Sequence, residues 1–225
     1  MSFDKTASFL IKTVIVLIVV TVVVKLVHQS IADDMRKSDL AKNNPYLEQR
    51  YMEENGLIKL NGKYFQYGVK EHGEVLPITK ALDAGCRNDE CKIKRYFHYV
   101  TNIEYKEDLN NTQNSVEVIM KGRGDCDEKS YLFASMLLQN GYESLLIYTN
   151  SHAFVGVNIP HFEDPHHWMC YYTYKGKKYY LAETTSKEAQ IGAFNGIDPK
   201  EYEIIFDVNA KKEIPLGQVA ATIYQ

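Results

Sequence analysis

The stretch from Gly122 to Gly141, GRGDCDEKSYLFASMLLQNG, decides the fold of this chain, because it predicts one long helix with a cysteine at its start. Asp125 is placed to cap the helix, and Glu128, three residues later, completes a capping box. Apolar side chains follow at helical spacing and predict a buried face, made of Leu132, Phe133, Met136 and Leu137. Gly141 is placed as the C-terminal cap. The cysteine is therefore expected in the first turn of a buried helix.

Cys126 has the position of an activated nucleophile. The first turn of a helix stabilises a thiolate through its unpaired N–H groups and its dipole. Gly122 and Gly124 allow a tight turn before the helix and leave room for a substrate carbonyl near those N–H groups. Asp127 and Glu128 act in the opposite direction, because their charges raise the thiol pKa. A nearby imidazolium is therefore required.

A base and an orienting acid are expected from two later strands. His152 follows the turn at Asn150 and Ser151 and begins a predicted strand, so it can point over the mouth of the sheet toward a helix N-terminus. Glu183 ends a later strand and can accept the other ring N–H of the histidine. Taken singly, such a histidine is more often a surface or core residue, and such a glutamate is a solvated edge charge. Together, the order Cys, His, acid is typical of a cysteine acyl-transfer enzyme.

The remaining patterns predict an α+β domain around these residues. Asn61 and Gly62 indicate a hairpin, and tyrosine-rich arms around Lys175, Gly176 and Lys177 indicate a second one. The expected helices and strands are a short helix over 46–55, the first hairpin over 57–67, a helix over 89–101 with Ile93, Phe97 and Val100 on one face, a helical or extended stretch over 115–120, strands over 144–149 and 152–158, and the second hairpin over 170–183.

Three runs of the chain resemble the transglutaminase-like superfamily, a branch of the papain-like cysteine enzymes: GRGDCDEKSYLFASMLLQNGYESLLIY, HAFVGV and YYLAETTS. The upstream run YFHYVTNIEY and residues 115–118 also resemble segments that precede the Gly-Asp-Cys of the family. The resemblance covers roughly residues 92–192. It implies a central helix that carries the cysteine and packs on an antiparallel sheet, with Cys126, His152 and Glu183 as the catalytic triad. The family usually has Asp as its acid, so Glu183 is a departure.

The resemblance also implies a thioester mechanism. Cys126 attacks an amide carbonyl, His152 protonates the leaving amine, and water or a second amine resolves the acyl-enzyme. The implied substrate is a peptide or protein amide, and no cofactor is expected. Peptidases, amidases and amine-transferring transglutaminases all occur in the superfamily, so hydrolysis and transfer both stay open. The alternatives are a catalytically silent module with a structural or interaction role and, less favoured, an acetyl-transferring enzyme that uses a coenzyme A thioester.

The run HFEDPHH over 161–167 contains three histidines and two acids and invites a metal interpretation. Its spacing matches no common zinc pattern and its central proline indicates a surface loop, so we expect no metal. The loop is instead expected to border the substrate cleft, with Trp168 as a wall and Gly124 and Asp125 as further lining residues. Cys170 is expected to be a small buried apolar residue rather than a second nucleophile.

The run FLIKTVIVLIVVTVVVKLV over 9–27 predicts an uncleaved transmembrane helix, because its charges, Lys12 and Lys25, lie near its ends. A cleaved signal peptide and a buried strand are the alternatives, but no small-x-small cleavage site follows Val27 and the run is long for a strand. The expected organisation is a tail over 1–8, the anchor over 9–27, a polar stalk with a short helix over 28–56, and one transglutaminase-like catalytic domain over 57–225.

The sequence gives opposing signals about the side of the membrane on which the catalytic domain lies. Basic residues flank the predicted span almost evenly, with a slight lean toward a cytosolic domain. Cys86 and Cys91 flank a short polar loop that could close a disulfide in an oxidising compartment, although two free thiols at a helix start are the alternative. On balance an extracytoplasmic catalytic domain is expected. The net charge of −3 and the scattered lysines give no reason to expect nucleic acid, so the expected partners are the bilayer and a substrate near it.

Overall fold

The computed structural model describes residues 49, 57–60, 63–66, 69, 73–107, 115–162, 169–193 and 201–222. The chain divides into two compact units, Met1–Glu54 and Asn55–Gln225, and the second contains every described residue except Gln49. The predicted tail and anchor, and the stalk apart from Gln49, lie outside the described ranges. Within those ranges, no helix is both long and apolar enough to cross a membrane.

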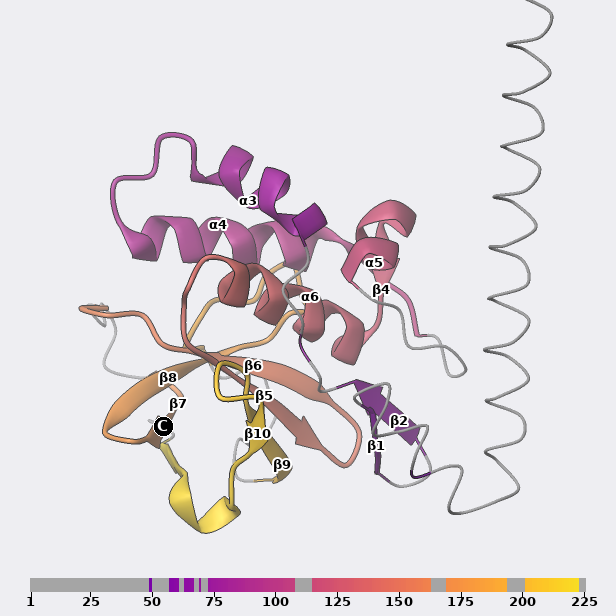
Figure 1. Ribbon diagram of the computed structural model, residues 1–225, viewed down its shortest axis with the longest axis vertical. Helices are drawn as coiled ribbons and strands as arrows, with labels where there is room; N and C mark the ends of the chain where they lie inside the picture. The colour runs from indigo at the N-terminus through magenta and orange to yellow at the C-terminus, as the bar shows by residue number, and fades with distance from the viewer. Residues whose placement is uncertain are drawn as a thin grey trace, which may run out of the picture. The chain divides into compact units, whose positions relative to one another are not determined.

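In the second unit a short pair of strands comes first, the helices come next, and most of the strands follow the last helix (Figure 1). In chain order the elements are β1 (Leu57–Leu60), β2 (Lys63–Gln66), the 3-10 turn η1 (Gly73–Val75), α3 (Leu76–Asp83), α4 (Asp89–Asn102), β3 (Glu104–Tyr105), α5 (Ser115–Lys121), β4 (Arg123–Gly124), α6 (Cys126–Gln139), β5 (Ser144–Thr149), β6 (Ala153–Val157), β7 (Tyr171–Tyr174), β8 (Lys177–Ala182), β9 (Tyr202–Asp207), β10 (Lys212–Glu213), the 3-10 turn η2 (Leu216–Gln218) and β11 (Ala220–Thr222).

Seven strands form one antiparallel sheet in the order β10-β9-β5-β6-β8-β7-β11. Every residue of β5 and β6 is buried, so these central strands are covered on both faces. Ile214 and Val219, next to the two end strands, join the same core cluster as Leu145 and Phe154 from the centre. The sheet therefore curls and covers one face with its own side chains, and this mixed helix–sheet arrangement fits a transglutaminase-like core.

Helix α6 covers the other face of the sheet and lies between the sheet and helices α3, α4 and α5 (Figure 1). The predicted apolar face is buried, with Leu132, Phe133, Met136 and Leu137 all inaccessible to solvent. Burial continues all round the helix from Cys126 to Leu137, including charged side chains. A helix buried on every side must satisfy its polar groups inside the protein.

Several local predictions are confirmed. Strands β1 and β2 pair as a hairpin, α4 extends one residue beyond the predicted 89–101, and the stretch after 115 is helical rather than extended. The second hairpin turns at Lys175 and Gly176, whose φ angles of 48° and 73° suit a tight two-residue turn. Helix α3 and strands β9 to β11 were not predicted.

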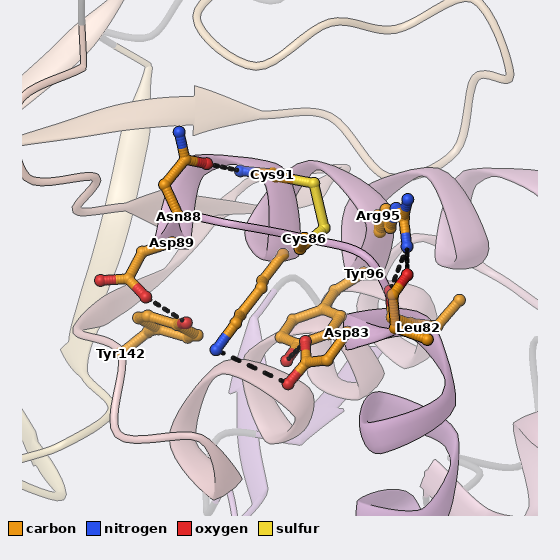
Figure 2. The surroundings of a disulfide bond; sticks show 11 residues. Leu82, Asp83, Cys86, Asn88, Asp89, Cys91, Arg95, Tyr96 and Tyr142 are labelled. Atoms are coloured by element: carbon orange, nitrogen blue, oxygen red, sulfur yellow. Dashed lines mark hydrogen bonds and ion pairs between the residues drawn. A yellow bond between two sulfur atoms is a disulfide. The ribbon is translucent and has the colours of Figure 1, made fainter.

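A disulfide between Cys86 and Cys91 closes the connection from α3 to α4 (Figure 2). The Asn88 side chain caps α4 by accepting a hydrogen bond from the Cys91 amide at 2.9 Å. Arg95, one turn further along α4, donates from Nη1 to the Leu82 carbonyl at 2.8 Å. The disulfide thus fastens the connection to α4, and the Arg95 side chain fastens the end of α3 to the same helix.

Candidate active site

The start of α6 is built by the predicted capping box. The Asp125 carboxylate accepts a hydrogen bond from the Glu128 amide at 3.2 Å, and the Asp125 amide donates to Glu128 Oε2 at 3.0 Å. Cys126 is the first residue of the helix and is 9% exposed. The capping box therefore places the thiol in the first turn, where the free backbone N–H groups of the helix are found.

The two glycines before the helix do different things. Gly122 has a φ of +64°, which is a conformation that favours glycine at a tight turn. Gly124 is buried, and a Cβ on it would lie 3.2 Å from Glu128 Oε2 and 3.3 Å from Val118 Cγ1. The missing side chain at 124 thus leaves space for the capping box, whereas the sequence had suggested space for a substrate carbonyl.

His152 lies immediately before β6 and is held there by the turn that joins β5 to β6. Its amide donates to Thr149 Oγ1 at 3.0 Å, and its carbonyl accepts from the Thr149 amide at 2.9 Å. The Nε2 atom of the ring lies 2.5 Å from Glu183 Oε2. The predicted base and acid are therefore in contact, across the ends of β6 and β8.

Glu183 is almost fully buried and is oriented from both sides. Its Oε1 atom accepts hydrogen bonds from the Thr185 amide at 2.7 Å and the Thr185 hydroxyl at 2.6 Å. Burial raises the pKa of this carboxyl, but the hydrogen bond and charge of His152, together with the two bonds from Thr185, lower it below its ordinary value. Glu183 is thus a carboxylate that can hold the imidazole in one tautomer, and its extra methylene is accommodated just beyond the end of β8.

The backbone of β6 connects the thiol to this pair. The Ala153 amide hydrogen-bonds to the Cys126 sulfur, as does the Asp127 amide, and both bonds lower the thiol pKa. Ala153 directly follows His152 in the chain. The structure thus brings the first turn of α6 to the point where β6 begins, so that the nucleophile, the base and the acid come from three adjoining elements.

The Cys126 thiol is nevertheless protonated at rest. Burial, followed by the charges of Asp127 and Asp125, raises its pKa to about 12, against the two backbone hydrogen bonds that lower it. The sequence had emphasised stabilisation of a thiolate by the helix N-terminus, and in the structure burial outweighs that effect. A proton must therefore leave the sulfur before the sulfur can attack.

Asp127 is itself a weak acid in this setting. Burial, a hydrogen bond to the Asp125 carboxyl and the charges of Asp125 and Glu128 raise its pKa well above the ordinary value. Ligand atoms of Asp125, Cys126 and Asp127 lie within 4.8 Å of one another, but the Asp125 carboxylate is engaged in the helix cap and the two aspartate side chains are hydrogen-bonded to each other.

Sequence reasoning missed a buried lysine beside the site. Lys129, one turn after the nucleophile, is inaccessible to solvent, and its Nζ atom donates to the carbonyls of Ile103 at 2.7 Å and Thr101 at 3.3 Å. Burial lowers its pKa to about 8, while the charge of Glu183 raises it and that of Lys187 lowers it. Its helical spacing from Leu132 and Met136, the buried face of α6, was the available signal.

Tyr105 was also missed. It is 47% exposed, and its strand β3 pairs in parallel with β4, so that its Cα lies opposite that of Gly124. Burial raises its pKa to about 12, followed by the charges of Cys126, Glu107, Asp125 and Glu183. A partly exposed tyrosine therefore lies beside the short strand that leads into α6.

Other residues named from the sequence lie away from this network or outside the described ranges. Trp168 and most of the segment 161–167 are not described, and His161 is exposed with a φ of +58°. Cys170 is a free, fully buried cysteine in the core cluster on the face of the sheet opposite α6, as expected of a small apolar residue. Its burial raises its pKa.

Comparison with known families agrees with this geometry. Residues 77–183 match the family model described as the transglutaminase-like superfamily. The matched range contains Cys126, His152 and Glu183 and overlaps the resemblance read from the sequence. Comparison with curated proteins gave no match. The matched segment, with its cysteine-bearing helix on a curled antiparallel sheet, suggests a papain-like cysteine enzyme fold.

Proposed function

We propose that this protein is a membrane-anchored cysteine peptidase or amidase, or an acyltransferase, that acts on peptide or protein amides through a thioester on Cys126. The observation that carries the proposal is the linked set of contacts from the Cys126 sulfur to the Ala153 amide, and from the adjacent His152 ring to Glu183. An isolated cysteine at a helix start would not need a histidine held by a buried carboxylate nearby.

The reaction follows from the protonation states of these groups. Because Nε2 of His152 binds Glu183, Nδ1 is the ring nitrogen left to accept the thiol proton as the sulfur attacks the amide carbonyl. The Glu183 carboxylate stabilises the imidazolium that forms. The imidazolium then gives its proton to the leaving amine, and the acyl group stays on sulfur. Water or a second amine, deprotonated by the same imidazole, releases the acyl group and restores the thiol.

We place the catalytic unit at a membrane and on its extracytoplasmic side. The apolar run over 9–27 supports an anchor, and the Cys86–Cys91 disulfide supports an oxidising compartment, since such bonds are rare in reducing ones. Carbonate extraction of membranes tests the anchor, and protease protection in sealed vesicles tests the side. Release of the full chain by carbonate would refute anchoring. In sealed vesicles whose cytoplasmic face is on the outside, the proposed orientation predicts that the catalytic domain is protected from added protease.

The catalytic proposal is tested by alkylation of the native full chain with iodoacetamide, followed by peptide mapping. We expect Cys126 to react at pH 7 much faster in the wild type than in a His152→Ala variant. Cys170→Ala is the matched control, because it removes the other buried free cysteine, which lies on the opposite face of the sheet. Turnover of a generic acyl donor such as p-nitrophenyl acetate should be lost in Cys126→Ala and kept in Cys170→Ala.

One observation favours a second candidate, a catalytically silent module that serves as a membrane-anchored structural or interaction protein. A thiol with a pKa of about 12 is ionised in only about one molecule in 10⁵ at pH 7, against about 3% for an ordinary cysteine. If His152 does not take the proton, alkylation of Cys126 should be at least about a thousandfold slower than that of free cysteine. A rate that slow, with no effect of His152→Ala, supports the silent module and contradicts the enzyme.

A further inference from the structure

The backbone ladder between β6 and β8 stops before it reaches the candidate site. At this end its last paired residues are Val155 and Ala182. Continuing the same antiparallel register places Ala153 opposite Thr184, next to His152 and Glu183 respectively. The contact between base and acid therefore lies beyond the last ladder pair, where the backbone pairing no longer sets the separation of the two strands.

A side chain from α6 bridges the strands at this point. Ser130 Oγ donates to the Ala153 carbonyl at 3.1 Å and lies 3.0 Å from Thr184 Oγ1. All three residues are inaccessible to solvent. Since a hydroxyl has one proton and the carbonyl only accepts, the second bond runs from the Thr184 hydroxyl to Ser130 Oγ.

The bridging serine belongs to the same helix as the nucleophile. Ser130 lies four residues after Cys126, and thus one turn along α6. Ala153 is held twice, through its amide by the Cys126 sulfur and through its carbonyl by Ser130. A buried helical serine with no outside partner commonly bonds a carbonyl of its own helix, but this hydroxyl reaches two strands.

We propose that Ser130 is a positioning residue that fixes the ends of β6 and β8 on α6, and so sets the distances among Cys126, His152 and Glu183. The inference rests on the proposed function, because it assigns Ser130 a role in that same triad. The two hydrogen bonds of its side chain go to Ala153 and Thr184, and not to the sulfur of Cys126 or the imidazole of His152. Without the hydroxyl, the Ala153 carbonyl and the Thr184 hydroxyl lose their shared partner, and the two strand ends can separate.

The test compares Ser130→Ala with Ser135→Ala in the full chain. Ser135 lies on the same helix, is equally buried, and accepts a hydrogen bond from the Ser115 hydroxyl at 3.0 Å, so its loss is a matched deletion outside the site. Two readouts are used: the rate of Cys126 alkylation by iodoacetamide at pH 7, and the imidazole N–H resonance of His152 in a proton NMR spectrum. A purely structural role would move neither readout more than the control does.

We expect Ser130→Ala to slow alkylation about tenfold or more, since displacements of about 1 Å in a site have effects of this size, and to shift the His152 resonance. Ser135→Ala should leave both readouts as in the wild type. Thr184→Val keeps the shape of its side chain and removes only the donor, so it should slow alkylation in the same direction even if Ser130→Ala fails to fold.

The outcomes separate this inference from the proposed function. If the wild type is reactive but Ser130→Ala and Thr184→Val behave as Ser135→Ala does, the positioning role is wrong and the enzyme proposal stands. If Cys126 of the wild type is as slow as the silent module requires, the proposed function fails first. A resonance of His152 that shifts in Ser130→Ala while the wild type is unreactive would show that the serine sets the geometry of a silent site.

Discussion

Substitution of Lys129 by methionine isolates the free energy of burying a charge beside the site. The ammonium group is inaccessible to solvent and has two carbonyl partners. Burial lowers its pKa from 10.5 to about 8, so the charged form is disfavoured in the folded protein by about 3 kcal/mol relative to the unfolded chain. Methionine has a similar length and no charge, but it leaves the carbonyls of Thr101 and Ile103 without this donor.

The sign of the pH dependence follows from proton binding. Between about pH 8 and pH 10.5 the unfolded chain holds a proton on Lys129 that the folded protein has released, so the stability of the wild type rises with pH in this window. The variant lacks this group. The free energy of unfolding of the wild type minus that of Lys129→Met should therefore increase by about 1.3 kcal/mol from pH 7 to pH 9. The lost carbonyl partners cost the variant the same at both values and cancel.

Urea unfolding of the full chain, followed by the near-ultraviolet circular dichroism of its tyrosines, measures this difference at each pH. Between about pH 5 and pH 6.5 the difference should stay flat, because Lys129 is protonated in both states, and this window serves as the internal control. A difference that is also flat from pH 7 to pH 9 would refute the assignment of a buried, charge-disfavoured lysine. A difference that falls would mean that the site stabilises the ammonium.

Three further changes have expected outcomes. Gly124→Ala should lower the free energy of unfolding by about 1–3 kcal/mol in urea titrations, because its Cβ would crowd Glu128 Oε2; an unchanged midpoint would show that the capping box can shift at no cost. Glu183→Gln should slow Cys126 alkylation at pH 7, because the imidazolium loses its carboxylate; equal rates in wild type and variant would remove Glu183 from the triad. Because the pKa of Glu183 is lowered in the folded protein, its ionisation stabilises the fold above its ordinary pKa of 4.5, and this stability is lost as the pH falls through the lowered value. The free energy of unfolding of Glu183→Gln should therefore depend less on pH in acid. Replacing both Cys86 and Cys91 by serine should cost about 2 kcal/mol in urea unfolding, from the small loop that they close; thiol titration of the unfolded wild type should find only two free thiols, and four would contradict the bond.

Local signals predicted the part of the site that depends on local structure. The capping box at Asp125 and Glu128 satisfies backbone groups within one turn, so it can be read from four residues. The hairpin of β7 and β8 likewise follows from its turn at Lys175 and Gly176. Because α6 and β8 were predicted at the correct positions, the start of α6, which carries Cys126, and the end of β8, next to Glu183, were also predicted correctly.

What depends on packing between distant elements could not be predicted in this way. The protonated state of Cys126 results from burial under neighbouring elements, whereas its position in the helix pointed toward a thiolate. Lys129 and Ser130 look like ordinary helical positions until the C-terminal end of α4 and the ends of β6 and β8 are brought against them. Strand β9 has its partner β5 more than 50 residues earlier, beyond the reach of any local pattern.

The position of β9 has a consequence for the order in which the protein is made. Cys126, His152 and Glu183 are all synthesised before Tyr202–Asp207, and until β9 has been made β5 lacks one of its two neighbours. At that stage the nascent chain contains every residue of the proposed chemistry. The edge of β5 that will later pair with β9 is still open, and β5 is an apolar strand. A chain truncated before β9 should contain Cys126, His152 and Glu183 and yet aggregate. The last strands therefore protect the sheet that carries the site, although they contribute no catalytic residue.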